Sequence, residues 1–159
     1  MKQNLLYARD TLLGVIILAL GIAFGTAAQR TTERRYIKAP ANSSLQQLPF
    51  SEGVLVGDTL YVAGHIGIDP KTGNAPASID AEIKNLFDDF KHTLTEGGMT
   101  MDDLVQVEVH CTNLSLYDKF NAAYRANFSK DFPARAFLGA NQLLRDAHFE
   151  MLGIAVKRH

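Results

Sequence analysis

The hydrophobic period of the chain changes at Gly97-Gly98. Before these glycines, apolar residues recur three or four positions apart, which predicts a long amphipathic helix that starts near Ser78 and ends at the two glycines. The apolar positions of this repeat are Ile83, Leu86, Phe87, Phe90 and Leu94. After the glycines, apolar and polar residues alternate over residues 104–112, which predicts a strand with one buried face. The apolar positions of that alternation are Val105, Val107, Val109 and Cys111.

The segments on either side extend this pattern into an α+β chain. Two short apolar runs flank Gly57-Asp58 and predict a tight hairpin. A second helix is predicted from Tyr117 to Phe128, followed by a strand after Pro133 and a last strand over residues 148–156. The predicted order is therefore ββ, α, β, α, ββ, a mixed sheet with both helices on one face. Because the other face also carries apolar residues, we expect an oligomer to bury it.

Composition and motifs exclude several classes of function. The 159 residues suffice for one domain with a real core, and a net charge of −1 gives no reason to expect nucleic acid as a partner. The single cysteine, Cys111, rules out an intramolecular disulfide. No common zinc, dinucleotide or phosphate-loop motif is present, and the histidines do not lie at metal-ligand spacing. We expect neither a metal nor another cofactor.

The amino-terminal region predicts a membrane or export segment. Residues 11–28 are uncharged and would span about 27 Å as a helix, close to the thickness of a bilayer core. The expected organisation is a leader at residues 1–10, an anchor or signal segment at 11–28, a linker at 29–48 and the folded domain at 49–159.

The length of the apolar run favours an uncleaved anchor and hence a membrane-anchored protein. The alternative is export to the periplasm after cleavage near Thr26 to Ala28. Basic residues after the segment outnumber those before it, which argues for a domain held on the cytoplasmic side, the reverse of export.

Four sequence phrases occur in an order that resembles the RidA/YjgF family of reactive-intermediate (enamine/imine) deaminases. They are IDPKTGN, NLSLYDKFNAAYRANF, the PAR tripeptide and EMLGIAVKRH. The resemblance covers about 110 residues, from Pro49 to the carboxyl end. It implies a chorismate-mutase-like α+β sandwich, assembled as a homotrimer with a ligand cleft at each subunit boundary.

The resemblance also implies a role for Arg135, which follows Pro133-Ala134. In the family this arginine grips the carboxylate of a 2-imino or 2-aminoacrylate acid while water adds to the imine carbon, releasing ammonia and a 2-keto acid. A guanidinium fork suits a carboxylate because two parallel hydrogen bonds fix its orientation. Gly64 and Asn121 also match the family pattern.

Several other positions depart from that pattern. The glutamate expected to orient the attacking water is Leu152, which can neither accept nor relay a proton. Glu150 lies on the same face of that strand but about 6 to 7 Å away. The usual tyrosine is Phe50, the usual serine is Ala63 and the usual cysteine is Phe137. His65 is a candidate substitute base, and its alternative interpretation is a structural histidine.

Three functions remain open at this stage. The first is an imine deaminase, or C–N hydrolase, whose enlarged apolar pocket, formed by Phe50, Phe137 and Leu152, favours bulkier imino acids. The second is a non-catalytic trimeric module at the membrane in which Arg135 binds a small carboxylate or keto acid. The third is an interaction or chaperone-like trimer whose effect does not depend on Arg135.

Overall fold

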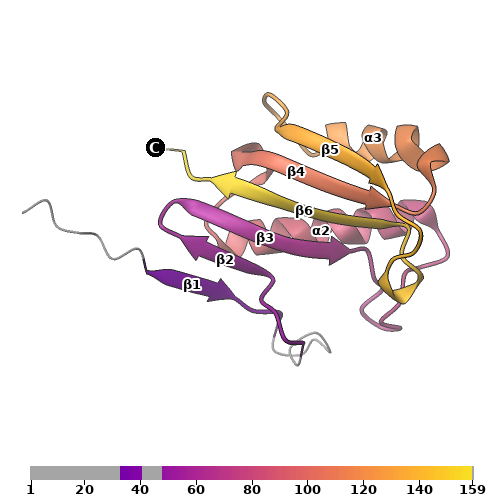
Figure 1. Cartoon of the computed structure of the whole chain (residues 1–159), viewed down its shortest axis with the longest axis horizontal. Coiled ribbons are helices and arrows are strands. Elements are labelled where there is room, and N and C mark those ends of the chain that lie inside the picture. Colours follow the sequence, from indigo (N-terminus) through magenta and orange to yellow (C-terminus); the bar gives the residue numbers. More distant parts are fainter. Residues whose placement is uncertain (1–32, 41–47, 159) are drawn as a thin grey trace, which may run out of the picture. The chain divides into compact units, whose positions relative to one another are not determined.

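Six strands form one mixed sheet in the computed structural model, which describes residues 33–40 and 48–158. The strands are β1 (Arg34–Ile37), β2 (Gly53–Val56), β3 (Thr59–Ile66), β4 (Leu104–Cys111), β5 (Ala134–Gly139) and β6 (Phe149–Val156). Their order across the sheet is β1-β2-β3-β6-β4-β5 (Figure 1). The β4–β5 pair is parallel and the other pairs are antiparallel, so the sheet is mixed as predicted.

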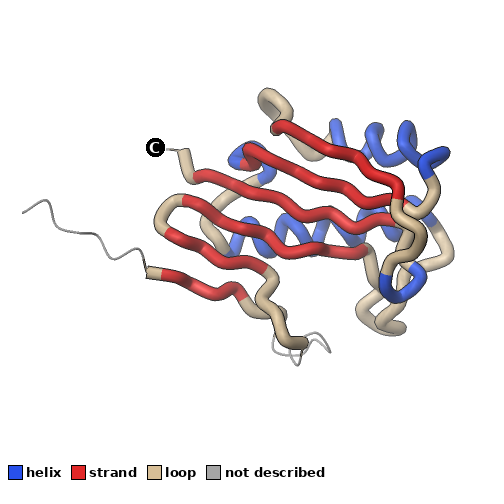
Figure 2. The backbone as a smooth tube through the Cα atoms, viewed as in Figure 1, coloured by secondary structure: helices blue, strands red, loops and turns tan. Residues whose placement is uncertain are grey.

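Two helices, α2 (Ile79–Glu96) and α3 (Tyr117–Arg125), cover the same face of the sheet (Figure 2). The core lies between the helices and the sheet. Phe90 of α2, Phe120 of α3 and Phe149 of β6 are fully buried there. The α+β class is confirmed, and Cys111 packs in the core as expected. The predicted order of elements is present with one further strand, β1, before it.

The long helix is bounded by the residues that predicted its ends. The side chain of Ser78 accepts a hydrogen bond from the backbone N–H of Ala81, and acidic residues occupy the first turn. At the other end the chain passes through Gly98, whose φ of +73° favours glycine. In the β2–β3 hairpin, Gly57 supplies the positive φ that a two-residue turn requires.

The predicted alternation in β4 is wrong at its first residue. Val105 is 48 % exposed, whereas Val107 and Val109 are fully buried. The register between β4 and β6 shifts between Leu104 and Gln106, so Val105 is the extra residue of a bulge. One extra residue reverses the side on which a strand side chain lies.

The predicted linker contains a strand of the sheet. Residues 34–37 form β1, which pairs with β2, and Ile37 is buried at 4 % exposure. A segment of four residues, of which only Ile37 is buried, is too short to be recognised as a strand from the sequence. The other boundaries of the expected organisation stay predictions.

The predicted localisation is contradicted. None of the helices formed by residues 33–40 and 48–158 is both long and apolar enough to cross a bilayer. Residues 11–28, on which the anchor and the exported alternative both rested, lie outside the described residues.

The sheet face opposite the helices carries an apolar row that crosses four strands. Tyr36 of β1 pairs with Val54 of β2, Val54 pairs with Tyr61 of β3, and Tyr61 pairs with Ile154 of β6. Tyr36 and Tyr61 are each more than half exposed. The second apolar face that the sequence predicted is therefore present.

Candidate functional site

A hollow of about 460 Å³ opens beside β3 and the start of β6. Its lining residues are Leu48, Phe50, Glu52, Ala63, Gly64, His65, Ile66, Ile68, Asp89, Leu144, Arg145 and Glu150. The apolar members form most of the wall, and the charged members come from four separate parts of the chain. A mostly apolar hollow with a few polar groups is the usual form of a small-molecule site.

The floor of this hollow depends on Gly64. A Cβ at this position would collide with the carboxylate of Glu150, because that side chain lies directly against the Gly64 backbone. Glycine at this position therefore allows the Glu150 carboxylate to lie inside the hollow. Ala63 and Phe50, which replace hydroxyl-bearing residues of the family pattern, also line it.

His65 lies in the wall between two carboxylates. Its Nδ1 is 2.6 Å from Asp89 Oδ2. Its Nε2 is 3.4 Å from the backbone carbonyl of Glu52 and 3.7 Å from Glu52 Oε2. An irregularity in the β3–β6 pairing between Val62 and His65 turns the imidazole toward the helix side, where it contacts the edge of the Phe90 ring. His65 is only 2 % exposed.

Burial perturbs the acid next to this histidine. Desolvation raises the pKa of Glu52, an effect that nearby His65 opposes and Asp89 reinforces. The same three side chains offer ligand atoms that lie within 4.8 Å of one another, so Glu52, His65 and Asp89 are the described residues that could hold a metal ion.

Arg135 lies on β5 in a different setting. Its guanidinium is 4.4 Å from the centre of the Tyr124 ring, and its Nη2 donates a hydrogen bond to Asn121 Oδ1 at 2.7 Å. Tyr117 flanks the same group at 5.9 Å. Among the described residues, no carboxylate forms an ion pair with Arg135. With Phe137 at 5.7 Å, three aromatic rings and an amide therefore hold a cation that has no counter-ion among the described residues.

Tyr117, Asn121 and Tyr124 together form a cradle around Arg135. The pKa values of its two tyrosines are shifted in opposite directions. Hydrogen bonding to Asn121 and the charge of Arg135 lower the pKa of Tyr117, which is exposed. Burial raises the pKa of Tyr124 to about 12, although Arg135 acts in the opposite direction. Tyr124 is thus a neutral ring under the cation at physiological pH.

The predicted site residues form two groups within one chain. Phe50, Ala63, Gly64, His65 and Glu150 line the hollow, whereas Asn121 and Phe137 accompany Arg135. Three strand spacings, about 14 Å, separate β3 from β5.

The enlarged apolar pocket that the sequence predicted is not assembled within one chain. Phe137 packs against Tyr117 and Phe120, and Leu152 lies opposite Glu108 on the other face of the sheet. Of the described residues, neither Phe137 nor Leu152 lines the hollow.

Four residues of these two groups were not predicted as site residues. Tyr117 and Tyr124 lie one helical turn before and after Asn121, so their spacing was available, but it was interpreted as part of a core stripe. Glu52 and Asp89 lie 13 and 24 residues from His65, and no local motif connects them.

Strand alternation alone would place His148 on the face of Glu150, but its side chain contacts α2 instead. Its Nδ1 is 2.7 Å from the carboxylate of Glu82, which is fully buried and also accepts the backbone N–H of Phe149. His148 immediately precedes β6, so strand alternation does not apply to it. The pair joins α2 to β6 and has a structural role.

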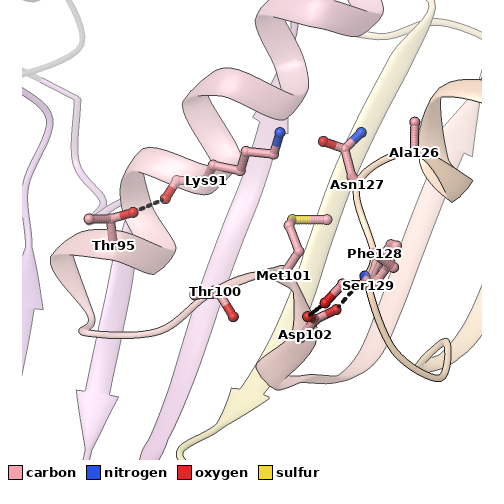
Figure 3. A pocket seen from close by; sticks show the side chains of 9 residues that line it. All are labelled: Lys91, Thr95, Thr100, Met101, Asp102, Ala126, Asn127, Phe128 and Ser129. Atoms are coloured by element: carbon pink, nitrogen blue, oxygen red, sulfur yellow. Dashed lines mark hydrogen bonds between the residues drawn. The ribbon is translucent and has the colours of Figure 1, made fainter.

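A second hollow, of about 350 Å³, lies between the carboxyl-terminal ends of the two helices (Figure 3). Its polar groups are largely satisfied by one another. Asp102 accepts hydrogen bonds from Ser129, and the Thr95 hydroxyl donates to the Lys91 carbonyl. None of the predicted site residues lines it. We therefore assign the candidate site to the hollow beside β3 and to the Arg135 cradle.

Comparison with known proteins places the chain in one family. Residues 40–157 match the family described as Endoribonuclease L-PSP. A RutC family protein of Saccharolobus solfataricus is 36 % identical over 110 residues, which cover 69 % of this chain and 87 % of the relative. The 2-iminobutanoate/2-iminopropanoate deaminase of Escherichia coli K12 is 32 % identical over 113 residues, covering 69 % and 88 % of the two chains.

Solved structures agree with the fold. The YjgF gene product of E. coli superposes with a TM-score of 0.70 at 30 % identity, covering 78 % of this chain and all of the other. E. coli TdcF with bound serine gives the same TM-score at 23 % identity over 78 % of this chain, a similarity of fold alone.

Proposed function

Because the chain belongs to the endoribonuclease L-PSP family, also called RidA/YjgF, we propose that it is an enamine/imine deaminase that hydrolyses 2-imino acids to 2-keto acids and ammonia. The observation that carries the proposal is the Arg135 guanidinium, which aromatic rings and Asn121 hold without a carboxylate partner among the described residues. A cation held in this way can accept the carboxylate of a small acid. The deaminase named among the relatives makes an imino acid the first substrate class to test.

A homotrimer would bring the two halves of the site together. Arg135 and the hollow lie on strands three positions apart in one sheet, too far for one small ligand to contact both. In a trimer that buries the apolar row Tyr36, Val54, Tyr61 and Ile154, the cradle of one subunit would face the hollow of its neighbour. A symmetric ring of identical interfaces is the common way for such a face to be covered.

The wall of the hollow suggests a preference for apolar imino acids. Phe50, Leu48 and Leu144 present apolar surface. Ala63 occupies the position at which the family resemblance expects a serine hydroxyl. A larger apolar substituent at C3 of the imino acid would gain burial there. The expected substrates are therefore 2-imino acids with bulkier apolar side chains than 2-iminopropanoate.

Cleavage of RNA is not favoured by this site. Glu52, Asp89 and Glu150 place three carboxyl groups in or beside the hollow, against the single cation of Arg145. A phosphate backbone would be repelled there, and the chain as a whole has a net charge of −1.

A small-carboxylate-binding module without catalysis is the second candidate. Leu152 favours it, because a leucine replaces the glutamate that the family resemblance associates with water. This candidate predicts saturable binding of keto acids without turnover.

The test measures the appearance of 2-keto acid when small and bulky 2-imino acids are generated in situ in the presence of the full-length chain. Native protein should accelerate hydrolysis, and Arg135→Ala should abolish the acceleration. Arg135→Lys should recover little, because an ammonium cannot form the two parallel bonds. Arg145→Ala tests the arginine that lines the hollow. If it abolishes activity and Arg135→Ala does not, the clamp is assigned to the wrong arginine. Keto-acid binding with no acceleration for any substrate would establish the binding module instead.

A further inference from the structure

A small hollow of about 190 Å³ opens beside Arg135, where β5 forms one edge of the sheet (Figure 1). Arg125, from the last turn of α3, lines the same hollow. The rest of its lining includes Tyr117, Asn121, Tyr124 and Phe132. Two guanidiniums therefore face one hollow, and none of the described residues that line it is acidic.

The helical repeat of α3 brings Arg125 to this hollow. Tyr117, Asn121 and Arg125 are spaced four residues apart, so they lie on one face of the helix. Asn121 on that face accepts the hydrogen bond of Arg135, and the Tyr117 ring flanks the same guanidinium. Arg125 therefore extends the cradle of Arg135 by one helical turn.

Aromatic rings connect the two arginines. The Arg135 guanidinium lies 4.4 Å from the centre of the Tyr124 ring, and the Tyr124 ring is stacked with Phe132 at 6.1 Å. The Arg125 guanidinium lies 5.9 Å from the centre of the Phe132 ring. Neither arginine has an ion-pair partner among the described residues. The rings restrain both cations without neutralising them.

The two cations differ in exposure. Arg125 is exposed, whereas Arg135 is partly buried. The hollow therefore has an outer and an inner cation. An exposed charge attracts an anion from solution, and a partly buried guanidinium fork fixes the orientation of an anion that has arrived.

We propose that Arg125 is a second carboxylate-binding residue, which attracts the carboxylate of the substrate to the hollow and stabilises it there together with Arg135. The proposal rests on the deaminase function proposed above, because it concerns the same bound acid. The two arginines have different roles in it. Arg125 contributes charge, and Arg135 contributes the two parallel hydrogen bonds that orient the acid.

The local charge supports this role, although the whole chain has a net charge of −1. Asp118, at the start of α3, is close enough to influence Tyr117, but it does not line the hollow. Two cations without a facing anion give the hollow a positive potential even in a nearly neutral protein. A small anion is the ligand that such a potential favours.

A structural role at the end of the helix is the alternative for Arg125. A basic residue in the last turn interacts favourably with the helix dipole, and Arg125 occupies that position in α3. This role would affect stability and leave ligand binding unchanged. Binding and stability are therefore measured separately.

The experiment uses the full-length native chain, Arg125→Gln and Arg125→Lys. It measures kcat and KM for 2-imino acids generated in situ, and the Kd of 2-ketobutanoate by calorimetry. At low ionic strength, Arg125→Gln should raise KM and Kd by about three- to tenfold, with kcat unchanged within about twofold. Arg125→Lys should recover most of that loss, because the outer position needs charge. Arg135→Lys should recover little, because the inner position needs the fork.

Lys119→Gln is the matched control. It removes one positive charge from the same helix, but Lys119 pairs with Asp80 and does not line the hollow. KM and Kd should stay at their native values in this variant. Salt provides a second readout, because exposed charges are screened. The difference between native protein and Arg125→Gln should shrink as NaCl is raised from about 0.01 M to about 0.5 M. A loss that does not depend on salt would contradict the proposal.

The outcomes separate this proposal from the function on which it rests. If no 2-imino acid is hydrolysed faster than in buffer, the deaminase function fails, and the Kd of 2-ketobutanoate still tests Arg125. If the native chain is active and needs Arg135, but Arg125→Gln keeps native KM and Kd at low salt, only the role of Arg125 fails. If the native chain neither hydrolyses an imino acid nor binds 2-ketobutanoate, both fail.

Two further measurements identify what would replace the proposal. A lower Tm for Arg125→Gln with unchanged Kd would assign Arg125 to the end of the helix. A smaller oligomer of that variant in sedimentation, again with unchanged Kd, would assign Arg125 to a contact between subunits.

Discussion

The guanidinium of Arg135 lies 4.4 Å from the centre of the Tyr124 ring, and the hydroxyl of that tyrosine has no hydrogen-bond partner among the described residues. The ring therefore supports the cation through its face, while its hydroxyl is buried and unsatisfied. A buried hydroxyl without a partner costs free energy of folding. The position of the Tyr124 ring under Arg135 therefore lowers the stability of the fold.

We expect Tyr124→Phe to keep the cation on the ring and to remove that cost. The free energy of unfolding should stay constant or increase by about 1 kcal/mol, as measured by urea denaturation. Tyr117→Phe serves as the comparison, because the Tyr117 side chain is exposed and bonded to Asn121. A loss of more than 1 kcal/mol in Tyr124→Phe would show that the hydroxyl has a partner in solution.

Gly64→Ala should close the hollow without unfolding the chain. Its Cβ would displace the Glu150 carboxylate from the Gly64 backbone. We expect keto-acid binding, measured by calorimetry, to weaken at least tenfold, which is about 1.4 kcal/mol. Gly139→Ala is the control, since the nearest atom to its Cβ would be a Leu114 side-chain carbon at 3.5 Å. Equal binding by both variants would contradict the assignment of the hollow.

The stability of the protein should decrease as pH rises through the pKa of Glu52. Burial raises this pKa above its ordinary value of 4.5, so the folded state binds the proton more tightly than the unfolded state. That contribution is complete below pH 4.5 and is lost at higher pH. In thermal unfolding, Glu52→Gln should match native protein near pH 4 and gain in relative Tm toward pH 8. If the Tm of native protein instead rose relative to that of Glu52→Gln as pH increases, folding would lower the pKa of Glu52 and not raise it.

The strand formed by residues 34–37 should contribute measurably to stability. Ile37 is buried, and its carbonyl accepts the backbone N–H of Glu52 at 2.9 Å. Ile37→Ala should lower the free energy of unfolding by about 2 to 4 kcal/mol. Lys38→Ala, at the exposed neighbour, should change it by less than about 0.5 kcal/mol. If both variants unfold like native protein, β1 is not part of the stable fold.

Much of the fold could be predicted because its determinants are local. Ser78, the spacing of Phe87 and Phe90, and Gly98 define the long helix within twenty residues of sequence. The alternation of Val107, Val109 and Cys111 defines β4. The error at Val105 came from pairing with β6, since a bulge depends on two strands that are distant in the sequence.

The candidate site was predicted only in part. Arg135 and Gly64 lie in motifs that resemble a family, so their importance was visible in the sequence. Glu52 and Asp89 lie in no motif, and they reach His65 only because β2 pairs with β3 and α2 packs against β3. Contacts between segments that are distant along the chain leave no periodic signal.

The sequence by itself therefore determined the class of fold, the ends of its main elements and the arginine on which the proposed function depends. The first two follow from side-chain period, turn residues and caps, which act over a few residues. The arginine was indicated by the resemblance of its motif to a family. The tertiary structure decided that residues 34–37 join the sheet and that the Arg135 guanidinium packs against the rings of Tyr117 and Tyr124. It also placed a buried histidine between two carboxylates in the wall of the hollow. Those features depend on packing between remote segments, where a single shifted register or bulge reverses which groups meet.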